Sequence, residues 1–161
     1  MKYNIIAYDF EVFSKAKWWM VVFIDYETRE KTIILNNKQE LEEYYRLHKD
    51  DIFIGYNSRG YDQWILKGIL LGKDPFKIND GIIEEDKKGH QLLRNAKEVV
   101  LNNFDVANPM NSLKQLEGFM GSMIKESSVP FDLDRPLTED EIQETIKYCT
   151  HDVEETIKVF E

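Results

Sequence analysis

Three apolar runs at the start of the chain predict three neighbouring β-strands. Residues 3–12 are apolar at both odd and even positions until two acids interrupt them, which is typical of a central strand covered on both faces. The runs at 17–25 and 31–36 predict a second and a third strand, and the polar sequence YETRE between them suits a hairpin. We therefore expect the chain to open with a three-stranded meander.

Helices and strands alternate in the rest of the chain. Turn residues and helical spacing predict, in order, a helix capped by Asn37 and running to about residue 48, a strand at 51–57, a helix at 61–71 ended by Gly72, one short helix inside a surface excursion at 73–97, a strand at 98–106, a short helix at 111–121, a loop at 122–137, and a long last helix. Thr138 and Glu141 form a capping box at the start of that last helix. A meander followed by two crossover strands predicts an α/β fold with a mixed five-stranded sheet and helices on both faces.

Composition limits the size of the fold and its partners. The 161 residues, 42% of them hydrophobic, suffice for a single domain with a sizeable core. The 30 acidic and 21 basic residues give a net charge of −9. Such a chain is not expected to bind nucleic acid by overall attraction, because phosphates are also negative. A small local groove, or carboxylates neutralised by bound cations, would still allow binding.

The cysteine content and the apolar runs indicate the compartment. Cys149 is the only cysteine, so the chain cannot form an internal disulfide, which suits a reducing cytosol. No apolar run reaches the ~20 residues of a membrane span, and the apolar stretch at the N-terminus is too short for a signal peptide. We expect a cytoplasmic protein with no membrane partner.

Asp9 and Glu11 are the first candidate site residues. They lie two residues apart on the predicted first strand, so both side chains leave the same face. Neighbouring carboxylates repel each other and are costly to bury. A divalent cation would neutralise them, and carboxylate oxygens suit Mg²⁺ or Mn²⁺. The alternative interpretation is a strand end that simply reaches solvent.

Two later segments carry further acids. Asp62 falls in the first turn of the predicted helix at 61–71, where the helix dipole favours a negative charge. Tyr148 and Asp152 lie four residues apart and so share one face of the last helix. Each of these observations has a structural alternative, namely an acid that stabilises a helix start and a tyrosine that packs.

The three segments together resemble a known family. In chain order they read D-F-E on a central strand, N-x-x-x-Y-D at a strand-to-helix junction and Y-x-x-x-D on the C-terminal helix. This pattern resembles the three exonuclease motifs of the tyrosine branch of the DEDD superfamily, and looks most like the 3′–5′ proofreading exonuclease domain of a DNA polymerase. The spacing from Asn57 to Asp62 is similar to that of family B polymerases. The stretches SLKQLEGFMG and SSVPFDLDRPLT look like those of polymerases from bacteriophages or prophages.

The resemblance covers nearly the whole chain and implies a ribonuclease H-like fold and a two-metal site for Mg²⁺ or Mn²⁺. It implies that Asp9, Glu11 and Asp152 hold one metal ion. It implies that Asp9 and, mainly through water, Asp62 hold the second, and that Tyr148 orients the attacking water. Two such cations would stabilise the attacking and the leaving oxygen of a phosphoryl displacement.

The neighbours of Asp152 on the last helix have less specific interpretations. The histidine branch of the superfamily has its base five residues before the last aspartate, and that position is Lys147 here. His151 is turned roughly 100° away from Asp152 around the helix, so we expect a surface or interface residue there. Cys149 is expected to pack in the core.

Four residues are candidates for substrate contact. The family pattern implies that Asn57 and Tyr61 line the cleft beside Asp62. Phe10 and Phe13 flank the first motif and could stack on bases. The parity of Phe10 is opposite to that of the acids, which favours core packing, whereas Phe13 shares their parity and could wedge against the terminal nucleotide.

The resemblance implies a 3′–5′ exonuclease that acts on the 3′ end of single-stranded DNA. We expect residues 1–161 to be one exonuclease domain excised from a longer polymerase of a bacterial host cytoplasm, with the polymerase domain following Glu161. One alternative is a stand-alone exoribonuclease similar to ribonuclease D. The other is a catalytically silent domain of the same fold that holds DNA or serves a structural role, although such a domain should have lost one or more of the acids.

Overall fold

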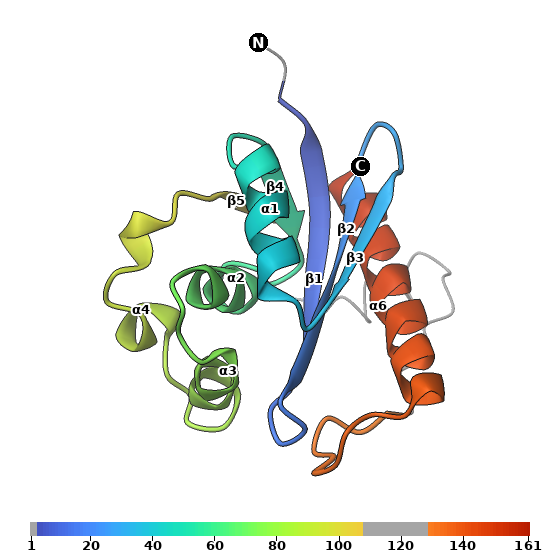
Figure 1. Ribbon diagram of the computed structural model, residues 1–161. Helices are drawn as coiled ribbons and strands as arrows, with labels where there is room; N and C mark the ends of the chain where they lie inside the picture. Colours follow the sequence, from blue (N-terminus) through green and yellow to red (C-terminus); the bar gives the residue numbers. More distant parts are fainter. Residues whose placement is uncertain (1–2, 108–128) are drawn as a thin grey trace.

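The chain forms a mixed five-stranded sheet with helices on both faces (Figure 1). The computed structural model describes residues 3–107 and 129–161. In the sheet order β3-β2-β1-β4-β5, the strands are β1 (Ile5–Phe13), β2 (Trp18–Asp25), β3 (Lys31–Leu35), β4 (Ile52–Gly55) and β5 (Asn102–Asp105). Strands β1 to β3 form an antiparallel meander, whereas β4 and β5 run parallel to β1. The predicted α/β fold with a central first strand and a ribonuclease H-like arrangement is confirmed.

The two faces of β1 are covered by different helices. Its even-numbered residues Ile6, Tyr8, Phe10 and Val12 belong to a core cluster shared with α1 (Lys38–His48), α2 (Asp62–Leu70) and α3 (Pro75–Ile83). Ala7, on the opposite face, packs in a second cluster with three residues of α6 (Glu139–Phe160), namely Cys149, Val153 and Ile157. Figure 1 shows α6 on one side of the sheet and the other helices on the far side. The odd-numbered acids of β1 therefore lie on the α6 face.

The capping residues predicted from the sequence begin α1 and α6 and end α2. The Asn37 side chain accepts a hydrogen bond from the Glu40 N–H at 3.1 Å and so begins α1. Gly72 follows α2 with a φ of +75°, a conformation that glycine adopts without a steric penalty. Thr138 and Glu141 form the predicted capping box of α6, and Arg135 donates two hydrogen bonds to the Glu141 carboxylate at 2.7 and 2.9 Å.

Residues 73–97 are more ordered than expected. They form α3, the short helix α4 (Gly89–Leu92) and most of a 3₁₀ turn, η1 (Ala96–Glu98), instead of one short helix on the surface. Ile78, Leu93 and Ala96 are buried in the same core cluster as β1. Asp74 caps α3 through the Phe76 N–H at 2.8 Å, with Pro75 in the first turn. The segment is therefore a layer of the fold and not a surface excursion.

One predicted strand is shorter in the structure, and two other predicted elements lie wholly or partly outside the described residues. The strand predicted at 98–106 is shorter, because Glu98 is the last residue of η1 and β5 begins at Asn102. The helix predicted at 111–121 and the first part of the loop predicted at 122–137 lie outside the described residues. Among residues 3–107 and 129–161, no helix combines the length and apolar character that a bilayer crossing requires.

A glycine lets α4 approach α2 closely. Gly89, the first residue of α4, is buried against the indole of Trp64, and a Cβ at this position would overlap three atoms of that ring. The Trp64 ring is held in turn by its own N–H, which donates to the Arg59 main-chain oxygen at 2.9 Å. The position of α4 thus depends on the absence of a side chain at residue 89.

We predict that Gly89→Ala destabilises the fold by about 1–3 kcal/mol, because the added methyl forces α4 away from Trp64. Chemical denaturation of both proteins would measure the difference. Gly60→Ala is the matched control, since its Cβ would meet only atoms of Asn57, the nearest being the side-chain oxygen at 3.2 Å. Equal stability of Gly89→Ala and the unaltered chain would show that α4 docks differently.

Candidate active site

One edge of β1 is left open halfway along the strand, and Asp62 binds to it. In the described part of the chain the ladder from β1 to β4 ends at Ala7, whereas pairing with β2 continues to Phe13. The Phe10 N–H beyond that point donates to Asp62 Oδ1 at 2.8 Å. Asp62 begins α2, where the helix dipole favours its charge, and is only 3% exposed. A side chain therefore replaces the missing strand at the carboxyl ends of β1 and β4.

Asp9 and Glu11 face α6 from the same strand. One oxygen of each carboxylate and the Cys149 sulfur lie within 4.8 Å of one another. The Cys149 thiol is 3.4 Å from the Asp9 main-chain oxygen and 3.6 Å from Asp9 Oδ2. Asp9 and Glu11 are half-buried, while Cys149 is fully buried. The predicted core position of Cys149 is confirmed, but its contact with Asp9 also makes it part of the site.

The fourth acid, Asp152, joins this cluster from α6. Burial raises the pKa of Asp9 well above its ordinary value, and the charges of Glu11 and Asp152 raise it further. The pKa of the Cys149 thiol is also raised, first by burial and then by all four acids. The carboxylates predicted to form one site, Asp9, Glu11, Asp62 and Asp152, are thus close enough for their charges to act on common groups.

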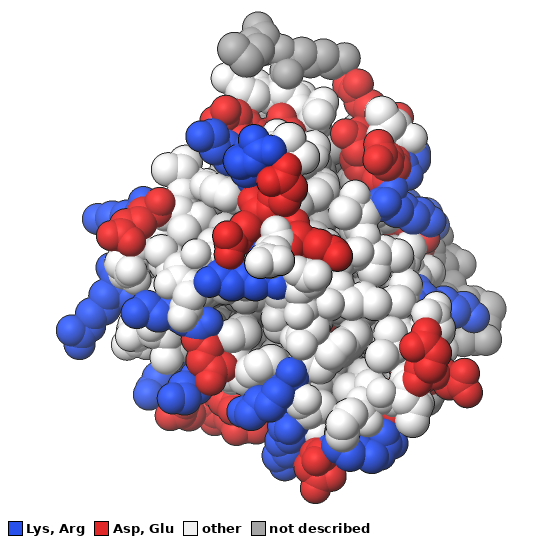
Figure 2. Space-filling view, in the orientation of Figure 1, with Lys and Arg blue, Asp and Glu red and all other residues white. Residues whose placement is uncertain are grey.

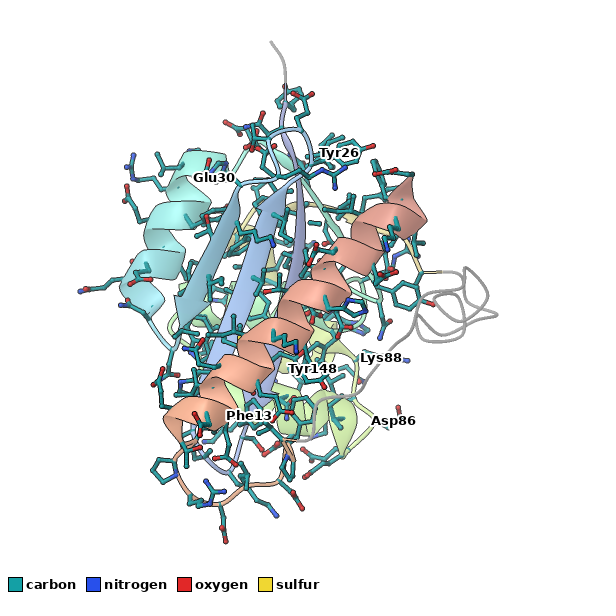
Figure 3. All side chains as sticks on the ribbon, turned by 90° about the vertical axis from the view of Figure 1, so that its right-hand side faces the viewer. Phe13, Tyr26, Glu30, Asp86, Lys88 and Tyr148 are labelled. Atoms are coloured by element: carbon teal, nitrogen blue, oxygen red, sulfur yellow. The ribbon has the colours of Figure 1, made fainter. Side chains whose placement is uncertain are left out.

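Tyr148 lies one helical turn before Asp152 on α6 and is half-buried. Figure 3 shows it on the helix that crosses in front of the strands. The two neighbours with weaker interpretations lie elsewhere on the helix surface. Lys147 is exposed, and His151 Nε2 is 3.9 Å from Glu155 Oε1 on the same helix.

The charge of the cluster fits a divalent cation. Burial raises the pKa of Asp62 well above its ordinary value, and the negative charge of Asp9 adds to the shift. Burial first, and then neighbouring negative charge, opposes the ionised form of both acids. Carboxylate oxygens are the ligands that Mg²⁺ and Mn²⁺ prefer, and a cation would remove the repulsion. The residues present therefore fit the predicted metal ions.

A pocket of about 340 Å³ lies along the open edge of β1. We call it the β1-edge pocket; its lining includes Phe10, Glu11, Tyr61, Asn79 and Phe131. Tyr61, a predicted substrate contact, is held there by a hydrogen bond from its hydroxyl to Asn79 Oδ1 at 2.6 Å. Burial and the neighbouring acid Asp62 raise the Tyr61 pKa well above its usual value, so the hydroxyl stays protonated. The pocket brings aromatic surface next to an acid of the cluster.

Of the two phenylalanine candidates for substrate contact, Phe13 is placed differently from expectation and Phe10 is placed as its parity favours. Phe13 is only 1% exposed and stacks on Phe131 with ring centroids 4.9 Å apart, so the prediction of a wedge at Phe13 is wrong. Phe131 covers it, is 54% exposed and lines the β1-edge pocket. Phe10 belongs to the core, as its parity predicts, and only part of its surface reaches the pocket.

Asn57 lies in the loop between β4 and α2, outside the β1-edge pocket. It has a φ of +59° and lines a second, larger pocket. Asp105, at the end of β5, holds this loop by accepting hydrogen bonds from the N–H groups of Asn57 and Arg59 at 2.9 and 3.0 Å. Asn57 and Tyr61, predicted to line one cleft beside Asp62, therefore line two different pockets.

Three residues of the site were missed from the sequence. Asp105 ends a strand that lies parallel to β1, and the end of a parallel strand was a usable signal. Cys149 lies three residues before Asp152, so helical spacing places it near the same face. Phe131 gave no signal, because it follows a proline in a segment without regular structure.

No family model matches the chain, and no curated protein matches it. Function is therefore inferred from the residues of the site.

We predict that the metal-free chain becomes less stable as the pH rises above about 4, the usual pKa of an aspartate. Asp9 and Asp62 have raised pKa values in the folded chain, so folding favours their protonated forms and loses that advantage as pH passes through the raised values. Asp9→Asn should weaken this pH dependence and raise the metal-free stability at pH 7, because an amide carries no charge to bury. Thermal unfolding in a chelator across pH 4 to 8 would measure both effects.

The same proteins give a control for metal binding. Saturating Mg²⁺ or Mn²⁺ should stabilise the unaltered chain at pH 7, by ~2.7 kcal/mol at a hundred times the dissociation constant. Asp9→Asn should show little of this gain. A metal-free stability that rises with pH, or equal stabilisation of both proteins by metal, would contradict the assignment of these acids.

Proposed function

We propose that the chain is a 3′–5′ exonuclease that hydrolyses the 3′-terminal phosphodiester of single-stranded DNA. The observation that carries the proposal is the convergence of four carboxylates from β1, α2 and α6, with a tyrosine one turn from the last of them. The acids belong to three separate elements, so their convergence depends on the fold and not on a local acidic run. These residues occur along the chain in the same order as the three exonuclease motifs that the sequence resembles.

The residues have separate roles in this proposal. Asp9, Glu11 and Asp152 would hold one divalent ion, and Asp9 with Asp62, the latter mainly through water, would hold the second. When bound, Mg²⁺ or Mn²⁺ supplies the positive charge that stabilises the attacking and leaving oxygens of the phosphodiester. Asp62 accepts a hydrogen bond from the Phe10 N–H, so its carboxylate has a defined direction.

Tyr148 is the residue proposed to orient the attacking water. Its phenol can both donate and accept a hydrogen bond, and it shares a helix face with Asp152. A water held between the phenol and a carboxylate would be positioned without the need for a histidine. Tyr148 is half-buried, which leaves part of it accessible to solvent.

The β1-edge pocket is proposed to take the terminal nucleoside. Its volume of about 340 Å³ is at the lower end of the range for small-molecule sites. Phe131 offers an exposed ring, and Tyr61 forms part of the wall beside Glu11. Stacking on an aromatic ring accepts any base, which suits an enzyme that removes nucleotides without regard to sequence.

The biological setting remains part of the proposal. We propose that the activity proofreads for a DNA polymerase domain in the same parent protein, in the cytoplasm of a bacterial host. The support is the resemblance of the motifs and of the stretches SLKQLEGFMG and SSVPFDLDRPLT to phage-type polymerases.

We predict that the chain shortens a 5′-labelled DNA oligonucleotide from its 3′ end in Mg²⁺ or Mn²⁺ and not in a chelator. Asp9→Ala and Asp152→Ala should each lower the rate by about a hundredfold or more, because each removes a proposed metal ligand. Gel analysis of the products over time measures both the direction and the rate. Lys49→Gln, an exposed change at the end of α1, is the control.

The same assay with matched RNA tests the choice of substrate. Faster cleavage of RNA would replace the proposal with an exoribonuclease. No cleavage of either strand by folded, metal-bound protein would favour a silent domain that holds DNA.

We further predict that Phe131→Ala raises KM for single-stranded DNA about 5- to 100-fold while kcat changes little, the range expected for one lost base–aromatic stack. Steady-state rates over a range of oligonucleotide concentrations give the two constants. Loss of kcat with constant KM would instead place Phe131 in the reacting geometry.

A further inference from the structure

A second pocket adjoins the β1-edge pocket and has a different lining. We call it the α4 pocket; it has a volume of about 670 Å³ and is formed by the loop from Asn57 to Gly60, the start of α2, the end of α3 and the residues that lead into α4. Its exposed basic side chains are Arg59, Lys87 and Lys88, and His90 lies beside them. In a chain with a net charge of −9, three cations around one cavity form an unusual local environment.

The cations of this pocket are available to a ligand. Within residues 3–107 and 129–161, neither Arg59 nor Lys88 forms an ion pair, whereas Lys87 contacts Glu85 at 3.3 Å. Asp105, one of two acids in the lining, is already engaged by three main-chain N–H groups at 2.8 to 3.0 Å. Asp86 is the second acid, so the lining carries both signs of charge, and the cationic donors without an ion pair among the described residues are those of Arg59 and Lys88.

The lining also indicates what kind of anion fits. Trp64 is covered by Gly89 and by the Lys67 ammonium group, 5.3 Å from its ring centre, so it offers little free face for a stacked base. Arginine and lysine side chains such as Arg59 and Lys88 suit phosphate groups. The arginine guanidinium can donate two parallel hydrogen bonds to one phosphate, and the lysine ammonium group acts as a compact positive charge. The pocket is therefore suited to a sugar–phosphate backbone more than to bases.

The two pockets share a wall. Gly60 and Ile82 line the α4 pocket, while their chain neighbours Tyr61 and Ile83 line the β1-edge pocket. Figure 3 shows Lys88 and Asp86 together at one margin of the molecule, and Figure 2 shows basic side chains with acidic ones between them at the lower left, toward α3 and α4. A strand whose end occupies the β1-edge pocket could pass over this wall into the α4 pocket.

We propose that the α4 pocket binds backbone phosphates of the single strand on the 5′ side of the terminal nucleotide. This inference rests on the proposed exonuclease function, because it needs the strand end in the β1-edge pocket. It gives residues 82–90 a role in holding substrate, and it makes affinity depend on strand length. Arg59 and Lys88 are the positioning residues, since neither lines the β1-edge pocket with its acid Glu11.

Equilibrium binding tests this separately from catalysis. Fluorescence anisotropy would compare a thymidine decamer with a thymidine dimer, both labelled at the 5′ end and carrying phosphorothioate linkages that resist hydrolysis, in Mg²⁺ at several salt concentrations. The double variant Arg59→Gln/Lys88→Gln should bind the decamer about tenfold or more weakly at low salt and the dimer unchanged. The slope of log affinity against log salt should become shallower by ~1.4, or ~0.7 for each of two lost phosphate contacts.

A second double variant serves as the control for Arg59→Gln/Lys88→Gln, and three results would contradict the inference. Lys38→Gln/Lys49→Gln removes the same charge around α1, away from both pockets, and should leave the slope unchanged. Equal weakening of dimer and decamer, an unchanged slope, or displacement of the decamer by polyaspartate as readily as by unlabelled decamer would each overturn the inference.

Activity then separates this inference from the proposed function. Cleavage that depends on Asp9, with KM for the decamer raised and kcat unchanged in the double variant, supports both. Cleavage with no effect of the double variant on KM or binding overturns the α4 pocket alone. Absence of any cleavage overturns the exonuclease, whatever the binding data show.

Discussion

The structure depends on a strand that is fully paired on one edge and only partly paired on the other. Strand β4 leaves β1 after Ala7, and the Asp62 carboxylate takes over by accepting the Phe10 N–H at 2.8 Å. A carboxylate at that position brings a second negative charge close to Asp9. Burial alone already opposes the ionised form of Asp62, and the charge of Asp9 opposes it further. The open edge therefore creates both the space for a pocket and the electrostatic strain that a cation would relieve.

The features that could be predicted from the sequence are those set by local geometry. Strand parity placed Asp9 and Glu11 on one face, helical spacing placed Asp152 beside Tyr148, and capping chemistry fixed the starts of α1 and α6. These rules need only neighbouring residues. The mixed five-stranded sheet followed because a meander and two crossovers leave few arrangements.

The features that escaped prediction depend on partners far apart in sequence. Phe13 has the right parity for substrate, but Phe131 covers it, and no local rule connects those residues. Residues 73–97 looked like a surface excursion because short helices with glycines have weak periodicity. Their order comes from tertiary packing, such as Gly89 on Trp64. The contact between Cys149 and Asp9 likewise required the crossing of α6 over β1.

One helix supplies the whole C-terminal share of the cluster. Tyr148, Cys149 and Asp152 lie within two turns of α6, which is anchored at its start by Thr138, Glu141 and Arg135. A rigid rod moves as a body, so a tilt or slide of α6 would displace the phenol, the thiol and the acid together. The positions of these three groups are therefore coupled through the helix, so that none of them shifts along α6 without the others.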